Sequence, residues 1–410
     1  MFRILLLSVS LAVAGMVCAE PLTLDAALDL ARRQAPDVAL QAASVGAAAS
    51  ASVSAGRLPD PKLTVGIDNL PVSGADQWSL TRDSMTMQKV GLMQEVPNGG
   101  RRRAEADIAR AAAARAEAEL RVRLFEVQRD TALAWLDRYY VERRGALLDD
   151  LQRENQLFAA AVAAQLAGGR ALPADALVPR QEAAELDDRR DQQAGAIVKA
   201  KAALRRWVGA AADEPLAGEP PALPIDADHL RAHVHEHPEL AVFVPMTQAA
   251  QAEVHAAEAM KRPDWGVELS YGHRGREFGD MMSLQFTIGL PLFARTRQDP
   301  AIEARRRALD RVEAERAAML RDHAQGLETE LTEYDIASRQ LARMQELRLP
   351  LAQQKVDFQF ASYRGGRVDL GAVLGARREL IELRLQQLEL EGQRAAVAAR
   401  LHYVYGEGAR

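Results

Sequence analysis

Four histidines within nine positions form the densest group of side chains capable of chemistry, at His229, His233, His235 and His237. Imidazole nitrogens are common ligands of transition metals. On a helix, His229 and His233 would share one face, as would His233 and His237. The competing interpretation is structural, because His237 begins the segment HPEL (237–240), which has a counterpart in APDV (35–38). We favour the structural interpretation and predict neither a bound metal nor a cofactor.

No other arrangement of residues indicates catalysis. The sequence has no nucleophile turn accompanied by a Ser/His/Asp set, no phosphate-binding glycine loop and no HExxH motif. Its carboxylates fall in segments with helical periodicity, where they have arginine neighbours. We therefore expect a protein that is not an enzyme.

Composition narrows the possible classes further. The chain has 410 residues, of which 48% are hydrophobic, 27% charged and 5% aromatic. This length allows two or three domains, or one domain that is internally repeated. The formal net charge of −5 provides no basic surface for nucleic acid. The single cysteine, Cys18, excludes a disulfide scaffold.

The first 19 residues have the pattern of an export signal. Arg3 precedes an apolar run from Ile4 to Val17, and Ala19 offers a small residue before the cleavage point. We predict a cleaved signal peptide at 1–19. The alternative is a lipoprotein signal in which Cys18 is acylated. No later segment is apolar enough for a transmembrane helix, so contact with a membrane would require a β-barrel or surface binding.

The rest of the chain contains an internal sequence repeat. The triplet Gly168-Gly169-Arg170 recurs 197 residues later as Gly365-Gly366-Arg367, and the segment 204–209 recurs at the same offset as 401–406. We predict a first repeat at 20–209, a Pro-rich linker at 210–226 and a second repeat at 227–410.

Each repeat contains a stretch with the two-residue period of β-strands. In the first, Leu63, Val65 and Ile67 alternate with polar or small residues; in the second, Trp265 to Tyr271 and Met282 to Leu290 do the same. We predict strand hairpins at about 62–96 and about 265–291. The side chains expected on the polar face are Thr64, Asp68, Ser283, Gln285 and Thr287.

Long helices account for most of the remainder. Residues 101–167 contain no proline and only Gly145 as glycine, and a single helix of that length would measure about 100 Å. Residues 305–349 repeat the pattern until Pro350, which should break or kink the helix. The predicted fold class is mainly α with a small β part, built from duplicated long helical hairpins in a coiled-coil-like assembly.

A four-stranded sheet with an apolar face cannot stand alone in lipid, because its edge strands would remain unpaired. It must therefore close with copies of itself. Three chains would give a 12-stranded barrel wide enough for a lumen, with polar side chains inside and aliphatic and aromatic side chains toward lipid. The alternative is a soluble β-sandwich attached to helices.

The sequence resembles the TolC family of outer-membrane efflux channels over nearly all of the predicted mature length. The most specific stretch is YRGGRVDL (363–370), followed by Val373, Leu374, Ala376 and Leu380. The stretch QEVPNGGRR (94–102) is similar to the heavy-metal (CzcC-like) branch of the resistance-nodulation-division (RND) tripartite systems. The run RTRQD (295–299) departs from the Arg-Asn-Gln-Gly run usual in that branch.

The resemblance implies a homotrimer with a helical tunnel, and it assigns roles to the turns. The turns between helices would be periplasmic tips that contact an adaptor protein and form a gate, comprising Gly168, Gly169, Arg170, Tyr363, Gly365, Gly366 and Arg367. Asp175 and Asp369 follow the turns, and we expect either an acidic ring that favours cations or simple helix caps.

We therefore expect a passive duct in the outer membrane of a Gram-negative bacterium, with a long periplasmic extension. Its partners would be outer-membrane lipid, a periplasmic adaptor (membrane fusion protein) and an inner-membrane RND pump. The leading cargo is divalent heavy-metal cations, and the alternative cargo is drugs or other small organic compounds. Alternatives of another class are a periplasmic adaptor and a structural coiled-coil envelope protein.

Overall fold

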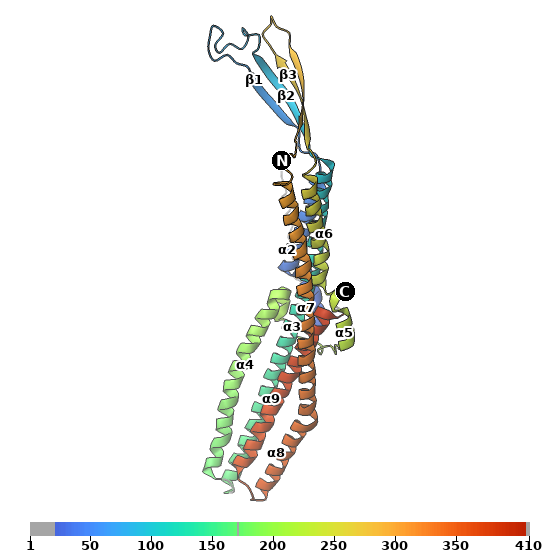
Figure 1. The fold of residues 1–410 in the computed structure, drawn as a ribbon. Helices are drawn as coiled ribbons and strands as arrows, with labels where there is room; N and C mark the ends of the chain where they lie inside the picture. The colour runs from blue at the N-terminus through green and yellow to red at the C-terminus, as the bar shows by residue number, and fades with distance from the viewer. Residues whose placement is uncertain (1–20, 170–171, 407–410) are drawn as a thin grey trace, which may run out of the picture. The chain divides into compact units, whose positions relative to one another are not determined.

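The structure is a computed structural model that describes residues 21–169 and 172–406 (Figure 1). The predicted signal peptide and Arg170 lie outside these residues. In chain order the elements are α1 (Leu24–Gln34), α2 (Pro36–Ser54), β1 (Lys62–Asp68), β2 (Met87–Val96), α3 (Gly99–Ala167), η1 (Pro173–Leu177), α4 (Val178–Val208), η2 (Gly209–Asp213), α5 (Ala227–His233), η3 (Val234–Glu236), α6 (Pro238–Ala259), β3 (Trp265–His273), β4 (Met281–Ile288), α7 (Gln298–Arg343), η4 (Met344–Arg348), α8 (Leu349–Arg364), α9 (Leu370–Arg400) and η5 (Leu401–Tyr405).

The element order is that of a duplication, since a helix, a strand hairpin and a pair of long helices occur twice. The compact units of the fold do not coincide with the sequence repeats. Of the described residues, one unit, which we call the helical unit, comprises 21–35, 127–169, 172–224 and 332–400. The other, the sheet unit, comprises 36–126, 225–331 and 401–406. Each unit therefore includes segments of both repeats. Among the described helices, none combines the length and the apolar character needed to cross a membrane.

The sheet unit contains one antiparallel sheet in the order β1-β2-β3-β4, in which β2 pairs with β3 and so joins the hairpins of the two repeats (Figure 1). The four strands agree with the predicted hairpins, although β4 ends at Ile288 rather than at Leu290. Each of the outer strands, β1 and β4, pairs with another strand of the described chain on one side only.

The register places apolar and polar side chains on opposite faces, as the alternation predicted. Leu63 lies opposite Leu92, which lies opposite Leu269, which lies opposite Leu284. This apolar face is open in the single chain, since Leu63, Leu284 and Phe286 are each at least 60% exposed. On the other face, Ser283 lies opposite Ser270. The expected polar side chains Thr64, Asp68, Gln285 and Thr287 lie on the same face.

In the helical unit, α9 packs against α3 and α4 on one side and against α7, η4 and α8 on another. Leu148 and Leu151 of α3, Leu186 of α4 and Ile381 of α9 form one buried cluster. A second cluster joins α9 to α7, η4 and α8, and contains Leu341, Met344, Ala352, Leu380, Leu383 and Leu390. The hairpin of α3 and α4 and the hairpin of α8 and α9 are thus held together by shared apolar packing (Figure 1).

The two long helices differ at one point. Helix α3 is continuous over 69 residues, whereas its counterpart is divided into α7 and α8 by the π-helical turn η4 (Met344–Arg348). Pro350 explains the difference, because its ring lacks an N–H and clashes with the carbonyl of Glu346, four residues earlier. The wider turn removes that clash, so the predicted interruption at Pro350 takes the form of a π-helical turn.

The linker between the repeats is fixed to the helical unit by α3. Leu22 and Leu216 form a parallel β-bridge, and Trp135 donates a hydrogen bond from Nε1 to the Leu22 carbonyl at 3.1 Å. Arg138 is 1% exposed and donates to the carbonyls of Ala212 and Glu214, each at 2.8 Å. A buried guanidinium therefore pairs two carbonyls at the end of η2 (Gly209–Asp213), where the linker leaves the helix.

Replacing Arg138 by Met should destabilise the protein by roughly 2–4 kcal/mol, because two linker carbonyls lose their donors while the apolar stem is retained. Thermal or denaturant unfolding followed by circular dichroism measures the change. The control is Arg153→Met, which removes an exposed ion pair with Asp150 on the same helix and should leave the transition unchanged. Equal effects of the two substitutions would contradict the role of Arg138.

Candidate functional site

The turn after α3 has the geometry expected of a helical hairpin tip. Gly169 has a φ of +67°, a left-handed conformation that residues with a Cβ adopt at a cost. The Gly168 amide donates to the Ala164 carbonyl at 3.1 Å, and the Gly169 amide donates to Leu166 at 3.0 Å. These bonds satisfy carbonyls at the helix end that have no partner within the helix.

The turn after α8 has the same geometry at the equivalent position. Gly366 has a φ of +70°, while Gly365 has an ordinary φ of −83°. The Arg367 amide donates to the Ser362 carbonyl at 3.0 Å, and the Gly366 amide donates to Tyr363 at 2.9 Å. This pair of bonds is a Schellman motif, which requires the left-handed residue at Gly366. In each repeat, therefore, the second glycine of the pair makes the reversal.

Tyr363 connects the tips of the two hairpins. Its hydroxyl donates to Gln165 Oε1 of α3 at 2.6 Å, and its ring packs on a cluster that includes Phe158 and Leu370. Burial raises the pKa of the Tyr363 hydroxyl, and the nearby charge of Asp175 adds to the increase. The hydroxyl thus remains a donor over the whole physiological range. Sequence reasoning identified Tyr363 but not its partner Gln165.

The two aspartates that follow the turns both bond to the backbone. Asp369 Oδ1 accepts a hydrogen bond from the Ala372 amide at 2.9 Å, at the start of α9, and Asp175 Oδ2 accepts from the Leu172 amide at 2.8 Å. Capping is therefore one role of both carboxylates. Arg367 is exposed, and its side chain makes no ion pair or hydrogen bond to the rest of the described chain.

The charges on the polar face of the sheet are paired with one another. Lys89 Nζ lies 3.3 Å from Glu268 Oε1 and 3.9 Å from Asp68 Oδ2, and Lys62 Nζ lies 2.5 Å from Glu95 Oε1. The pairs cross neighbouring strands, so they hold the side chains along the face rather than extended from it. Thr64 and Ser283 add neutral polar groups to the same face.

The four histidines do not form one cluster. The rings of His229 and His233 stack with centroids 4.2 Å apart, and His235 lies 3.8 Å from Glu236. His237 instead stacks on His323, with centroids 3.7 Å apart. The sequence pattern missed His323 because it lies on α7, far from the other histidines in the sequence.

Comparison with known proteins agrees with this architecture. Residues 233–407 match the family described as Outer membrane efflux protein, so the second half of the chain has the sequence pattern of that family. This match covers less than half of the chain and agrees with the resemblance seen in the sequence. The chain matches no curated protein sequence.

Solved structures with this fold include the channel protein CusC, with 16% sequence identity, a TM-score of 0.80 and coverage of 93% of this chain and 92% of CusC. The outer membrane protein VceC of Vibrio cholerae has 18% identity and a TM-score of 0.76, with coverage of 93% and 96%. The outer-membrane channel OprN has 15% identity and a TM-score of 0.77, with coverage of 94% and 90%. These likenesses establish the fold.

Replacing Gly366 by Ala should destabilise the second tip by about 1–2 kcal/mol. An added Cβ would meet nothing within 4 Å, so the cost comes from the left-handed backbone alone. Amide hydrogen exchange at the tip should become roughly 5- to 30-fold faster. Gly365→Ala is the matched control, because its φ of −83° suits alanine; equal effects at both positions would contradict the assignment.

Proposed function

We propose that this chain is the outer-membrane duct of a tripartite efflux system and acts as a homotrimer. The observation that carries the proposal is the sheet, which combines an exposed apolar face, a polar face and two outer strands with open edges. Closure by three copies would pair every edge and give a 12-stranded barrel, with the apolar face toward lipid and the polar face toward water. The predicted export signal at 1–19 would deliver the chain to the outer membrane of a Gram-negative bacterium.

The long helices would form the wall of a periplasmic tunnel, and their tips would contact an adaptor protein. The exposed side chain of Arg367 and the glycine turns at Gly168, Gly169, Gly365 and Gly366 support an accessible tip. Arg170 is assigned to the same surface from its place in the repeated triplet. The duct itself would be passive, and an inner-membrane RND pump would drive the cargo.

The tip would also act as a gate, held closed in part by the hydrogen bond between Tyr363 and Gln165. This bond links α8 to α3, so separation of the two hairpins requires that it break. Asp175 and Asp369 would place carboxylates beside the opening. Each uses one oxygen for a backbone cap, which leaves the other oxygen for solvated cations.

For the cargo we propose divalent heavy-metal cations. The support is the stretch QEVPNGGRR (94–102) and the carboxylates Asp175 and Asp369 near the tips. The alternative cargo, drugs or other small organic compounds, is compatible with the same architecture. A periplasmic adaptor or an envelope coiled coil fits less well, because neither accounts for a two-faced sheet with open edges.

Replacing Tyr363 by Phe should increase the conductance of the purified channel in planar bilayers. Losing one hydrogen bond of about 1 kcal/mol would shift the closed-to-open equilibrium roughly fivefold toward open. Tyr139→Phe is the control, because it removes a hydroxyl of α3 outside the tip. An unchanged conductance in Tyr363→Phe would remove this residue from the gate without affecting the proposed duct.

A strain that lacks the protein should become sensitive to zinc, cadmium, cobalt, nickel or copper, and expression of the protein should restore growth. Graded concentrations of each metal, beside dyes and detergents, measure the effect. Sensitivity confined to metals supports the heavy-metal cargo and identifies the cation. Sensitivity confined to dyes and detergents would assign the duct to organic compounds instead.

A further inference from the structure

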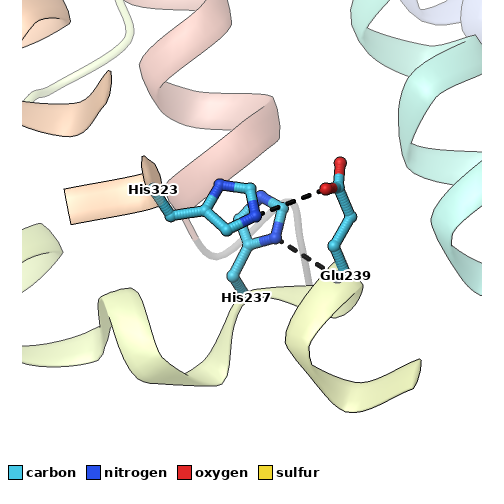
Figure 2. Close-up of side chains that lie close together, drawn as sticks. All are labelled: His237, Glu239 and His323. Carbon is cyan, nitrogen blue, oxygen red and sulfur yellow. Dashed lines mark hydrogen bonds and ion pairs between the residues drawn. The ribbon is translucent and has the colours of Figure 1, made fainter. Parts of the chain in front are cut away.

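Two histidines and a glutamate from separate parts of the sequence come together in the sheet unit, at the start of α6. His237 is the N-cap of α6, Glu239 lies in its first turn, and His323 extends from α7 (Figure 2). One ligand atom of each residue lies within 4.8 Å of the others. His237 is 7% exposed, and the side chains of His323 and Glu239 are 13% and 36% exposed. The cluster is thus largely buried, with one side open to solvent.

The two imidazole rings direct nitrogens toward the same point. They stack with centroids 3.7 Å apart and an interplanar angle of 29°, and each has a nitrogen on the side of Glu239 (Figure 2). His323 Nε2 lies 3.3 Å from Glu239 Oε2. His237 Nδ1 accepts a hydrogen bond from the Glu239 amide at 3.2 Å. Two nitrogens and a carboxylate therefore converge on one position.

One of these atoms, His323 Nε2, has a charged neighbour but no hydrogen bond. His323 Nε2 is buried and, despite its closeness to the carboxylate, has no hydrogen bond of acceptable geometry. A buried polar atom in a native protein normally has a partner, and an ion is one such partner. When the imidazole is neutral with its lone pair on Nε2, that lone pair and the carboxylate repel each other unless a cation lies between them.

The first repeat has an acidic residue at the equivalent place, but its partner is an arginine and not a histidine. Asp37 is the second residue of α2, as Glu239 is of α6, and Ala35 stands where His237 stands in the second repeat. Asp37 pairs with Arg123 of α3, with Oδ1 and Nη2 2.9 Å apart. An arginine stays protonated and cannot ligate a cation. The scaffold therefore does not need histidines here, and the ligand set belongs to the second repeat alone.

We propose that His237, Glu239 and His323 bind a divalent transition-metal ion of borderline softness, with Zn²⁺ as the representative case. Imidazole and carboxylate donors in this number suit such an ion, with solvent completing the coordination. A small hollow lined by His229, His233, His237 and Tyr405 lies beside His237.

Metal binding would connect α6 to α7 where the first repeat has its ion pair. Coordination through His237 Nδ1 would replace the hydrogen bond from the Glu239 amide, so the first turn of α6 would rearrange on binding. The ion would be resident rather than cargo, since a conducted ion must be bound weakly enough to leave. The site is therefore independent of the function proposed above and of the identity of the cargo.

The test is a titration of metal-free, full-length protein without a histidine tag, using Zn²⁺ in competition with a chromophoric chelator. We expect one ion per chain. His323→Gln should weaken binding at least about 100-fold. Zn²⁺ should also raise the Tm of the wild type by mass action and leave that of His323→Gln unchanged. The absence of stoichiometric binding, or equal affinities of the two proteins, would overturn the proposal.

Two further variants keep the outcome interpretable. The double variant His237→Ala/His323→Arg places an alanine where the first repeat has Ala35 and an arginine beside Glu239. It should therefore fold, form an ion pair with Glu239 and bind no Zn²⁺. His229→Gln/His233→Gln alters the neighbouring stacked pair and should retain the affinity within about twofold. Loss of binding in this second variant alone would place the metal elsewhere and overturn the assignment.

Conductance in bilayers separates this inference from the proposed function. A double variant His237→Ala/His323→Arg that conducts but binds no Zn²⁺ supports the site and leaves the duct intact. A wild-type protein that binds Zn²⁺ at this cluster but forms no channel would support the site and contradict the duct.

Discussion

Backbone hydrogen bonding at the edges of the sheet is the constraint that the rest of the chain must satisfy. In the described chain β1 and β4 each have one edge without a strand partner, and the apolar face beside them is open. An open edge is tolerable in water but costly in a membrane, where no solvent pairs the backbone. In the proposed function, pairing with copies of the chain would satisfy these open edges.

The two repeats share the same order of helices and strands but differ in particular side chains. Both repeats reverse their long helices at a left-handed glycine, Gly169 or Gly366. They differ in the long helix, which is continuous in the first repeat and has a π-helical turn before Pro350 in the second. The ion pair of Asp37 with Arg123 likewise corresponds to Glu239 beside His323.

The sequence was informative where local physics decides the outcome. Two-residue alternation located the strands and their faces, and paired glycines located the tips, because both depend on neighbours along the chain. Contacts between distant segments were not predictable in this way. Nothing near Tyr363 indicates Gln165, and nothing near His237 indicates His323, since both partners are set by how helices align. Arg138 was missed for the same reason, as its acceptors are linker carbonyls.

The negative charge at the helix turns depends on what the carboxylates of Asp175 and Asp369 contact, not only on their number. Asp369 caps the start of α9, where the helix dipole is equivalent to about half a positive elementary charge. The field of its carboxylate is therefore weaker than that of a full charge. Asp175 also shares its charge with a backbone amide, and it lies close enough to Tyr363 to contribute to the raised pKa of that hydroxyl. In the proposed duct, a weak negative field of this kind would attract cations without holding them, as conduction requires. Tight binding would belong elsewhere, at a cluster such as His237, Glu239 and His323, where three donors converge.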